Sequence, residues 1–233
     1  MTLSTSISGV FVPQINRIVA RGEGDDSLTR LFTRVGRIQF MLLMLVMTGF
    51  IFVGEPFIEA WGGGEYEGAY PIALLLMGPV TVPLIQNLGI EIQRAKNKHQ
   101  FRSKVYFFMA LGNVAISIPL AIRYGGMGCA LGTAISMIVC NGFVMNWYYH
   151  QHIGLDMLYF WKQILRIFPA FIIPVLLGII ALHVQDFTGY AGVVRFAIPY
   201  CAVYCASLYW FAMDGSEREL VNSIGRKLAS KVK

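Results

Sequence analysis

The Lys and Arg residues of this 233-residue chain fall in every second gap between long apolar stretches. All but two of the 19 basic residues follow this pattern, and the exceptions are Arg123 and Arg195. The alternate gaps are acidic or very short, and the longest, residues 55–68, contains four Glu residues and no Lys or Arg. Because cytoplasmic loops retain Lys and Arg, the pattern predicts a polytopic membrane protein with a cytoplasmic C-terminus.

Composition agrees with a membrane protein. Apolar residues make up 56% of the chain and charged residues only 14%, whereas soluble proteins carry about a quarter charged residues. The net charge of +6 comes from residues that flank apolar stretches, where they contact anionic lipid head groups. We therefore expect membrane lipids, and not nucleic acid, as partners.

The apolar stretches predict the number of membrane-spanning helices. A span needs about 20 mostly apolar residues. Six segments qualify: 36–54, 69–92, 104–123, 126–148, 164–184 and 190–213. Residues 1–15 are too short to span, and they end near Pro13 and Arg17 like the cytoplasmic end of a helix whose start is missing. The predicted fold is an all-α transmembrane bundle of six full spans and an N-terminal partial helix.

Two cytoplasmic segments have amphipathic patterns. In residues 25–37, Leu28, Leu31 and Val35 are expected to face the membrane, with arginines toward the head groups. The tail, residues 214–233, has Ser216 and Glu219 at capping-box spacing. Each segment is either a membrane-surface helix or a plain solvated one.

Prolines mark the best candidate for a broken helix. Pro79 and Pro83 lie inside one predicted span, and Gln86 and Asn87 follow them. Proline removes a helical hydrogen bond, and broken helices form binding sites in transporters. A static kink that only improves packing is the alternative.

Polar residues within the predicted spans are candidates for a hydrated lumen. Amides in hydrocarbon are costly unless they are bonded, so these side chains face other helices or water. The lumen candidates are Gln86, Asn87, Asn113, Ser117, Asn141 and Arg195. Arg195 either snorkels to the interface or faces the lumen, where it would hold an anionic group.

Motifs for catalysis, metals and cofactors are not evident. The four His residues have no nucleophile partner pattern, and the four Cys residues have no ligand spacing. The spacing of Gly128 and Gly132 predicts a helix-packing face. We therefore expect a protein that is not an enzyme and holds no cofactor or metal.

Several short motifs occur in an order that resembles a known family. They are Val12-Pro13-Gln14-Ile15, Val35-Gly36-Arg37-Ile38-Gln39-Phe40, Trp61-Gly62-Gly63, Ala95-Lys96-Asn97-Lys98, Asn113-Val114-Ala115-Ile116-Ser117 and Tyr124-Gly125-Gly126-Met127-Gly128. Together they resemble the C-terminal part of polysaccharide flippases of the multidrug/oligosaccharidyl-lipid/polysaccharide exporter superfamily. The resemblance covers residues 1 to about 150 well and the last two spans loosely.

The resemblance implies a fold, a substrate and a location. Residues 1–150 would form the C-terminal lobe of a two-lobe transporter, 151–213 two additional spans, and 214–233 a basic cytoplasmic tail. The substrate would be an oligosaccharide linked to a polyprenyl diphosphate lipid, moved across the bacterial inner membrane. The chain would be truncated and would need a missing N-terminal lobe as partner.

Three other hypotheses about function stay open at this point. A multidrug or cation antiporter fragment would need a coupling carboxylate, and none lies mid-span in this chain. A membrane enzyme of polysaccharide synthesis would usually carry a large external loop. The chain could also be a non-functional fragment, or a subunit that assembles with a separate lobe.

Overall fold

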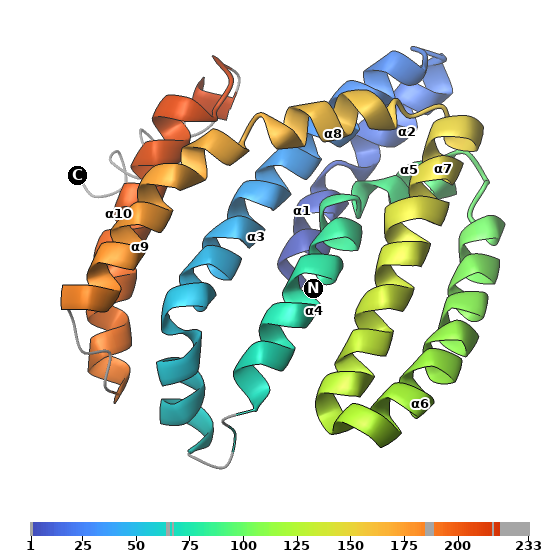
Figure 1. Cartoon of the computed structure of the whole chain (residues 1–233). Helices are drawn as coiled ribbons and strands as arrows, with labels where there is room; N and C mark the ends of the chain where they lie inside the picture. The colour runs from blue at the N-terminus through green and yellow to red at the C-terminus, as the bar shows by residue number, and fades with distance from the viewer. Residues whose placement is uncertain (1, 64–65, 67, 185–188, 216, 220–233) are drawn as a thin grey trace. The chain divides into compact units, whose positions relative to one another are not determined.

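The structure, a computed structural model, describes residues 2–63, 66, 68–184, 189–215 and 217–219 (Figure 1). Every regular element in these ranges is a helix. By length and composition, five helical segments can cross a membrane: Asp25–Gly62, Ala69–Ala95, Gln100–Ile153, Met157–His183 and Ala191–Phe211. The predicted all-helical class is therefore confirmed, and the five apolar helices are compatible with a membrane protein.

The chain divides into two compact units, Met1–Ile164 and Leu165–Lys233. Their boundary falls at the end of α8 (Met157–Leu165). The domain boundary predicted at residue 150, between the transport lobe and the two additional spans, stays a prediction.

Unit 1 is a set of long helices joined by short ones. Its further elements are α1 (Thr2–Val10), α2 (Val12–Arg21), α3 (Asp25–Gly62), α4 (Ala69–Ile85), α5 (Leu88–Ala95), α6 (Gln100–Met137), η2 (Ile138–Val144), α7 (Met145–Tyr148) and η3 (Tyr149–Ile153). α3 packs on α4, and α4 packs on α6. Figure 1 shows the short helices α2, α5 and α7 gathered at the end of the unit where α3 begins.

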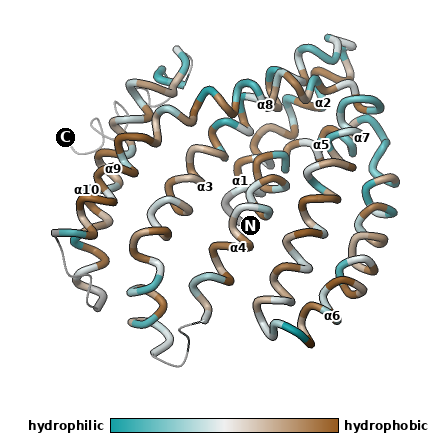
Figure 2. Tube along the Cα trace, viewed as in Figure 1, coloured by the Kyte–Doolittle hydropathy of each residue, from teal (hydrophilic) through white to brown (hydrophobic). Residues whose placement is uncertain are grey.

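Hydropathy follows this arrangement. Figure 2 shows hydrophobic colour along α3, α4 and α6, and hydrophilic colour at the end that carries α2, α5 and α7. α3 has 38 residues, which at about 1.5 Å per residue is far longer than a hydrocarbon layer of about 30 Å. Its first turns, around Arg30 and Arg34, therefore belong to the polar end of the unit.

Residues with left-handed backbone conformation terminate the short helices α2 and α5 at the polar end of unit 1. After α2, Gly22 has φ 63°, and the N–H groups of Gly22 and Glu23 donate to the carbonyls of Val19 and Ile18. After α5, Asn97 has φ 54°, and the N–H groups of Asn97 and Lys98 donate to Arg94 and Gln93. Both patterns are Schellman caps, which stop a helix and turn the chain sharply.

The first residues of the chain are held by buried polar groups. Residues 2–21 form two helices that bend at Phe11. Gln39 Nε2 on α3 donates to Ser4 O and to Ser8 Oγ, each at 3.0 Å. Ser4 Oγ in turn donates to Leu84 O at 2.7 Å. α1 is thereby fixed against α3 and α4 by hydrogen bonds within the bundle.

α6 reverses direction at Gly125, where φ is 58° and ψ is −137°, as Figure 1 shows. The predicted reversal is present, but both arms belong to one helical stretch from residue 100 to 153, so five segments stand where six were predicted. A Cβ at Gly128 would collide with Leu120 O, and one at Gly132 with Ser117. The predicted packing face of these two glycines is confirmed.

α4 passes through both of its prolines. Pro79 and Pro83 lie inside the helix, which continues to Ile85. The interruption follows at Gln86 and Asn87, before α5 begins at Leu88. The break of this span thus lies three residues after the proline nearest to it.

The amphipathic prediction for residues 25–37 is wrong in its orientation. Leu28, Leu31 and Val35 are buried by protein and do not face lipid. Arg37 is also buried, at 3% exposure, and its Nη1 donates to Gln163 O at 3.0 Å. The segment is the first part of α3 and not a separate surface helix, because its apolar face covers the core of the bundle.

Unit 2 contains η4 (Phe168–Phe171), α9 (Ile172–Val184) and α10 (Gly189–Phe211). Ser207 Oγ donates to Ala170 O at 2.6 Å. The rings of Phe196, Tyr200 and Tyr204 stack in succession along one face of α10. This aromatic face is buried, so packing fixes the pair of helices.

The prediction for the start of the tail stays untested. Ser216 and residues 220–233 lie outside the described residues, so the predicted capping pair and the amphipathic face behind it cannot be placed. In the described part, Asp214 N donates to a carboxylate oxygen of Glu217 at 2.9 Å. This contact has the form of a capping box two residues earlier than predicted.

Candidate functional site

Asn146, on α7, joins three helices of unit 1 through its side-chain amide. Its Oδ1 accepts hydrogen bonds from Gln86 Nε2 at 3.0 Å and from Trp161 Nε1 at 2.9 Å. Its Nδ2 donates to the carbonyls of Asn141 at 2.6 Å and Gly142 at 3.0 Å. One amide therefore connects the interrupted end of α4, the segment η2 and helix α8.

The π-helical geometry of η2 widens the backbone at this point. Met145 N donates to Cys140 O, five residues back, as in a π-helix. Such segments inside α-helices occur frequently at functional sites. Here the wide turn presents the carbonyls of Asn141 and Gly142 to the Asn146 side chain.

A second chain of hydrogen bonds reaches Asn141 from α6. Arg102 Nη2 donates to Tyr106 Oη at 2.7 Å, and Tyr106 Oη donates to Asn141 Oδ1 at 2.7 Å. Arg102 Nη1 donates to the buried Tyr149 Oη at 3.1 Å, and its guanidinium carbon lies 4.5 Å from the Tyr106 ring centroid. Asn141, 2% exposed, thus links the two chains through its side chain and its carbonyl. We call this set of residues the Asn141 network.

The charge of Arg102 has no acidic partner in the Asn141 network. Its hydrogen bonds go to neutral phenols, and it forms no ion pair with any described residue. A guanidinium has five N–H donors, so two bonds leave donors for another group. A half-buried cation that faces only neutral groups favours an anion nearby.

Asn113 and Ser117 belong to a different cluster, inside the α6 hairpin. Asn113 Oδ1 accepts from Ser117 Oγ at 2.7 Å and from Thr133 Oγ1 at 3.4 Å. Ser117 Oγ also lies 3.4 Å from Cys129 O, on the opposite arm. Among the described residues this cluster shares no hydrogen bond with the Asn141 network, and its bonds tie the two arms together.

The remaining predicted residues occupy separate places. Asn87 lies in the interruption after α4, where its N–H donates to Leu84 O and its carbonyl accepts from Ile90 N. Arg195 lies on α10 of unit 2 and is exposed. Two pairs of the six predicted lumen residues are therefore connected. Gln86 and Asn141 are linked through Asn146, and Asn113 and Ser117 are bonded directly.

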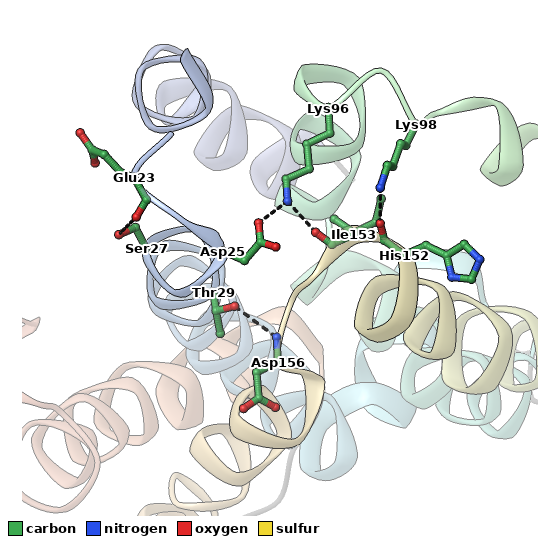
Figure 3. A network of polar contacts seen from close by, with 9 residues as sticks. All are labelled: Glu23, Asp25, Ser27, Thr29, Lys96, Lys98, His152, Ile153 and Asp156. Carbon is green, nitrogen blue, oxygen red and sulfur yellow. Dashed lines mark hydrogen bonds and ion pairs between the residues drawn. The ribbon is translucent and has the colours of Figure 1, made fainter. Parts of the chain in front are cut away.

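The basic loop after α5 closes the polar end of unit 1 (Figure 3). Lys96 Nζ forms an ion pair with Asp25 and donates to Ile153 O at 2.6 Å, while Lys98 Nζ donates to His152 O at 2.5 Å. Thr29 Oγ1 accepts from Asp156 N at 3.1 Å. These bonds connect the start of α3, the α5–α6 loop and the η3–α8 turn beside the Asn141 network.

The network includes residues that the sequence pattern did not single out as a site. Arg102, Tyr149 and Trp161 are not among the residues that the sequence predicted for the lumen. Arg102 and Tyr106 are four residues apart on one helix, and this spacing is the signal from which their contact could have been predicted. In the described part of the chain, His, Cys, Asp and Glu side chains form no group of three that could hold a metal ion.

Comparison with known proteins adds no assignment: the chain matches no family, no curated protein and no solved structure.

Proposed function

We propose that the chain is part of a flippase that moves a lipid-linked oligosaccharide across the bacterial inner membrane. The substrate is an oligosaccharide on a polyprenyl diphosphate. Its sugars pass along the polar groups of the bundle while its lipid tail stays in the bilayer. The protein acts by binding and releasing this amphiphile and makes or breaks no covalent bond.

The Asn141 network beside the interrupted α4 is the observation that carries this proposal. Gln86 and Asn141 are 3% and 2% exposed, and polar side chains that are buried between apolar helices are costly unless they serve structure or function. Discontinuous helices supply binding sites in many transporters. Amides and phenols suit sugar hydroxyls, and the guanidinium of Arg102 suits a phosphate.

The proposal includes a topology. Both arms of α6 cross the membrane, which makes six spans, and the hairpin at Gly125 lies outside. The α5–α6 loop, with Lys96 and Lys98, and the C-terminal tail lie in the cytoplasm. Arg195, on α10 of unit 2, binds an anionic group of the substrate.

Transfer of a fluorescent polyprenyl diphosphate oligosaccharide in proteoliposomes tests the function. We expect the protein to expose inner-leaflet substrate to an impermeant quencher faster than protein-free vesicles do. Fluorescent phosphatidylcholine should stay protected in the same vesicles, which excludes a general leak. Failure both to transfer the substrate and to bind it in a titration would refute the proposal.

A further inference from the structure

A groove with four arginines lies between α2 and the first turns of α3. Its volume is about 440 Å³, and Arg17 and Arg21 line it from α2 while Arg30 and Arg34 line it from α3. One acidic residue, Glu23, lies on its wall. All of these residues belong to unit 1, and none takes part in the Asn141 network. We call this feature the arginine groove.

The fold holds the arginine groove in shape. Each pair of arginines is four residues apart and therefore lies on one side of its helix. Ile18 of α2 and Leu31 of α3 are each 6% exposed and form the apolar floor between the two pairs. The tight turn that follows Gly22 leaves three residues between the helices, so the two pairs face one shared space.

The positive charge of the arginine groove is largely uncompensated. Arg21 lies 3.6 Å from the Glu23 carboxylate. Arg17, Arg30 and Arg34 form no hydrogen bond or ion pair with any described residue. Guanidinium groups held together in this way repel one another, and an anion between them relieves that repulsion. Phosphate oxygens fit the planar fork of guanidinium best.

The position of the arginine groove indicates where the phosphate comes from. Arg34 lies on the same helix as the apolar stretch that begins at Ile38, one turn away. The groove therefore lies at the polar end of a membrane-crossing helix, at the level of lipid head groups. Ile18 and Leu31 are buried beneath the arginines, so the two helices that carry the arginines are packed against each other at this level.

We infer that the arginine groove binds the phosphate of one anionic phospholipid, which bridges α2 and α3. This site does not depend on the proposed transport function. A bound lipid places a negative charge among the four arginines, which lowers their mutual repulsion and stabilises the α2–α3 corner. Free phosphate has the same oxygen atoms as a lipid phosphate, so the experiment must distinguish the two ligands.

The test is a titration of the purified full chain, in a zwitterionic detergent, with phosphatidylglycerol. The probe variant is Arg17→Gln/Arg34→Gln, which takes one arginine from each helix. The matched control is Lys162→Gln/Arg166→Gln, which removes the same charge from exposed residues outside the groove. Phosphatidylcholine, inorganic phosphate and pyrophosphate are titrated in parallel.

We expect one tightly retained phosphatidylglycerol in the parent and in the control, counted by native mass spectrometry. The affinity for phosphatidylglycerol should fall by roughly tenfold or more in Arg17→Gln/Arg34→Gln, because this variant loses two guanidinium contacts with charged oxygens. Arg17→Lys/Arg34→Lys keeps the positive charge but loses the planar guanidinium fork. Its affinity should lie between that of the parent and that of Arg17→Gln/Arg34→Gln.

Three results would overturn the inference. The first is equal affinity in the parent and the probe variant, and the second is an equal loss in the control, which marks a general charge effect. The third is binding of inorganic phosphate as tight as that of the lipid, which assigns the groove to a free anion. If Arg17→Gln/Arg34→Gln loses its helical circular dichroism, Arg30→Gln alone replaces it, with the same expected direction and the same refuting results.

Discussion

Gln86 and Asn146 lie 60 residues apart and are joined by a hydrogen bond of 3.0 Å from Nε2 to Oδ1. The bond connects the interrupted end of α4 to α7, and Asn146 Oδ1 also accepts from Trp161. Gln86 is 3% exposed, so its amide has no water to replace a lost partner. The pair is therefore a structural joint as well as a candidate part of the substrate path.

Replacing Asn146 by Leu should destabilise the protein more than replacing Gln86 by Leu. Asn146→Leu strands the donors of Gln86 and Trp161, at about 1–3 kcal/mol for each buried group. Gln86→Leu leaves Asn146 Oδ1 bonded to Trp161 and should cost less. Unfolding in detergent, followed by circular dichroism, measures both. The losses of unfolding free energy in the two single variants should not add up in the double variant. Strict additivity would show that Gln86 and Asn146 do not interact.

A Cβ at Gly132 should separate the arms of the α6 hairpin. It would collide with Ser117, including its backbone Cα, so the arms must move apart. We expect Gly132→Ala to lower stability by about 1–3 kcal/mol. Gly112→Ala is the matched control on the same helix, because a Cβ there meets nothing within 4 Å. Equal thermal stability of the two variants would show that the arms do not pack as described.

The predicted topology can be tested by thiol labelling in intact cells. Suitable sites are Glu59, on α3, and His99, just before α6, which are exposed and have negative φ values. Gly63 and Asn97 are less suitable, because their positive φ values would strain a new side chain. An impermeant thiol reagent should label Glu59→Cys from outside and His99→Cys only after lysis. Labelling of the parent protein corrects for its four cysteines. The opposite pattern would reverse the orientation.

Much of the fold was predictable from charge and hydropathy. The long apolar stretches, the reversal at Gly125 and the close contact at Gly128 and Gly132 follow from local composition. Hydropathy does not distinguish a side chain that faces lipid from one that faces protein, since both surroundings are apolar. For that reason Leu28 and Val35 were assigned to the membrane, although protein covers them.

The site was less predictable, for a physical reason. Gln86 and Asn141 stood out because isolated amides in apolar stretches are costly. Arg102 and Tyr149 did not, because each looked like an ordinary member of a basic or aromatic interface. Tyr149 follows the π-helical turn η2, which changes the direction of the side chains after it, and no sequence periodicity marks such a turn.

Arg102 should contribute to substrate binding beyond its charge. Arg102→Lys keeps the cation but cannot reach both Tyr106 and Tyr149 with a planar fork. We expect Arg102→Gln to weaken binding of the polyprenyl diphosphate oligosaccharide by about tenfold, and Arg102→Lys by less. Lys104→Gln, an exposed neighbour with no described partner, is the control. Equal affinities for the parent and all of these variants would show that Arg102 does not contribute to substrate binding.

Arg195 offers the sharpest test of the transport proposal in unit 2. It is exposed on α10 and is one of the two basic residues that depart from the alternating charge pattern. If it contacts an anionic group of the substrate, Arg195→Ala should abolish transfer in proteoliposomes, and Arg195→Lys should retain part of it because the charge remains. Val194→Ala, at the neighbouring exposed position, controls for perturbation of the helix. Because a snorkelling arginine contributes nothing to transfer, equal rates for the parent, Arg195→Ala and Arg195→Lys would place the side chain at the interface instead.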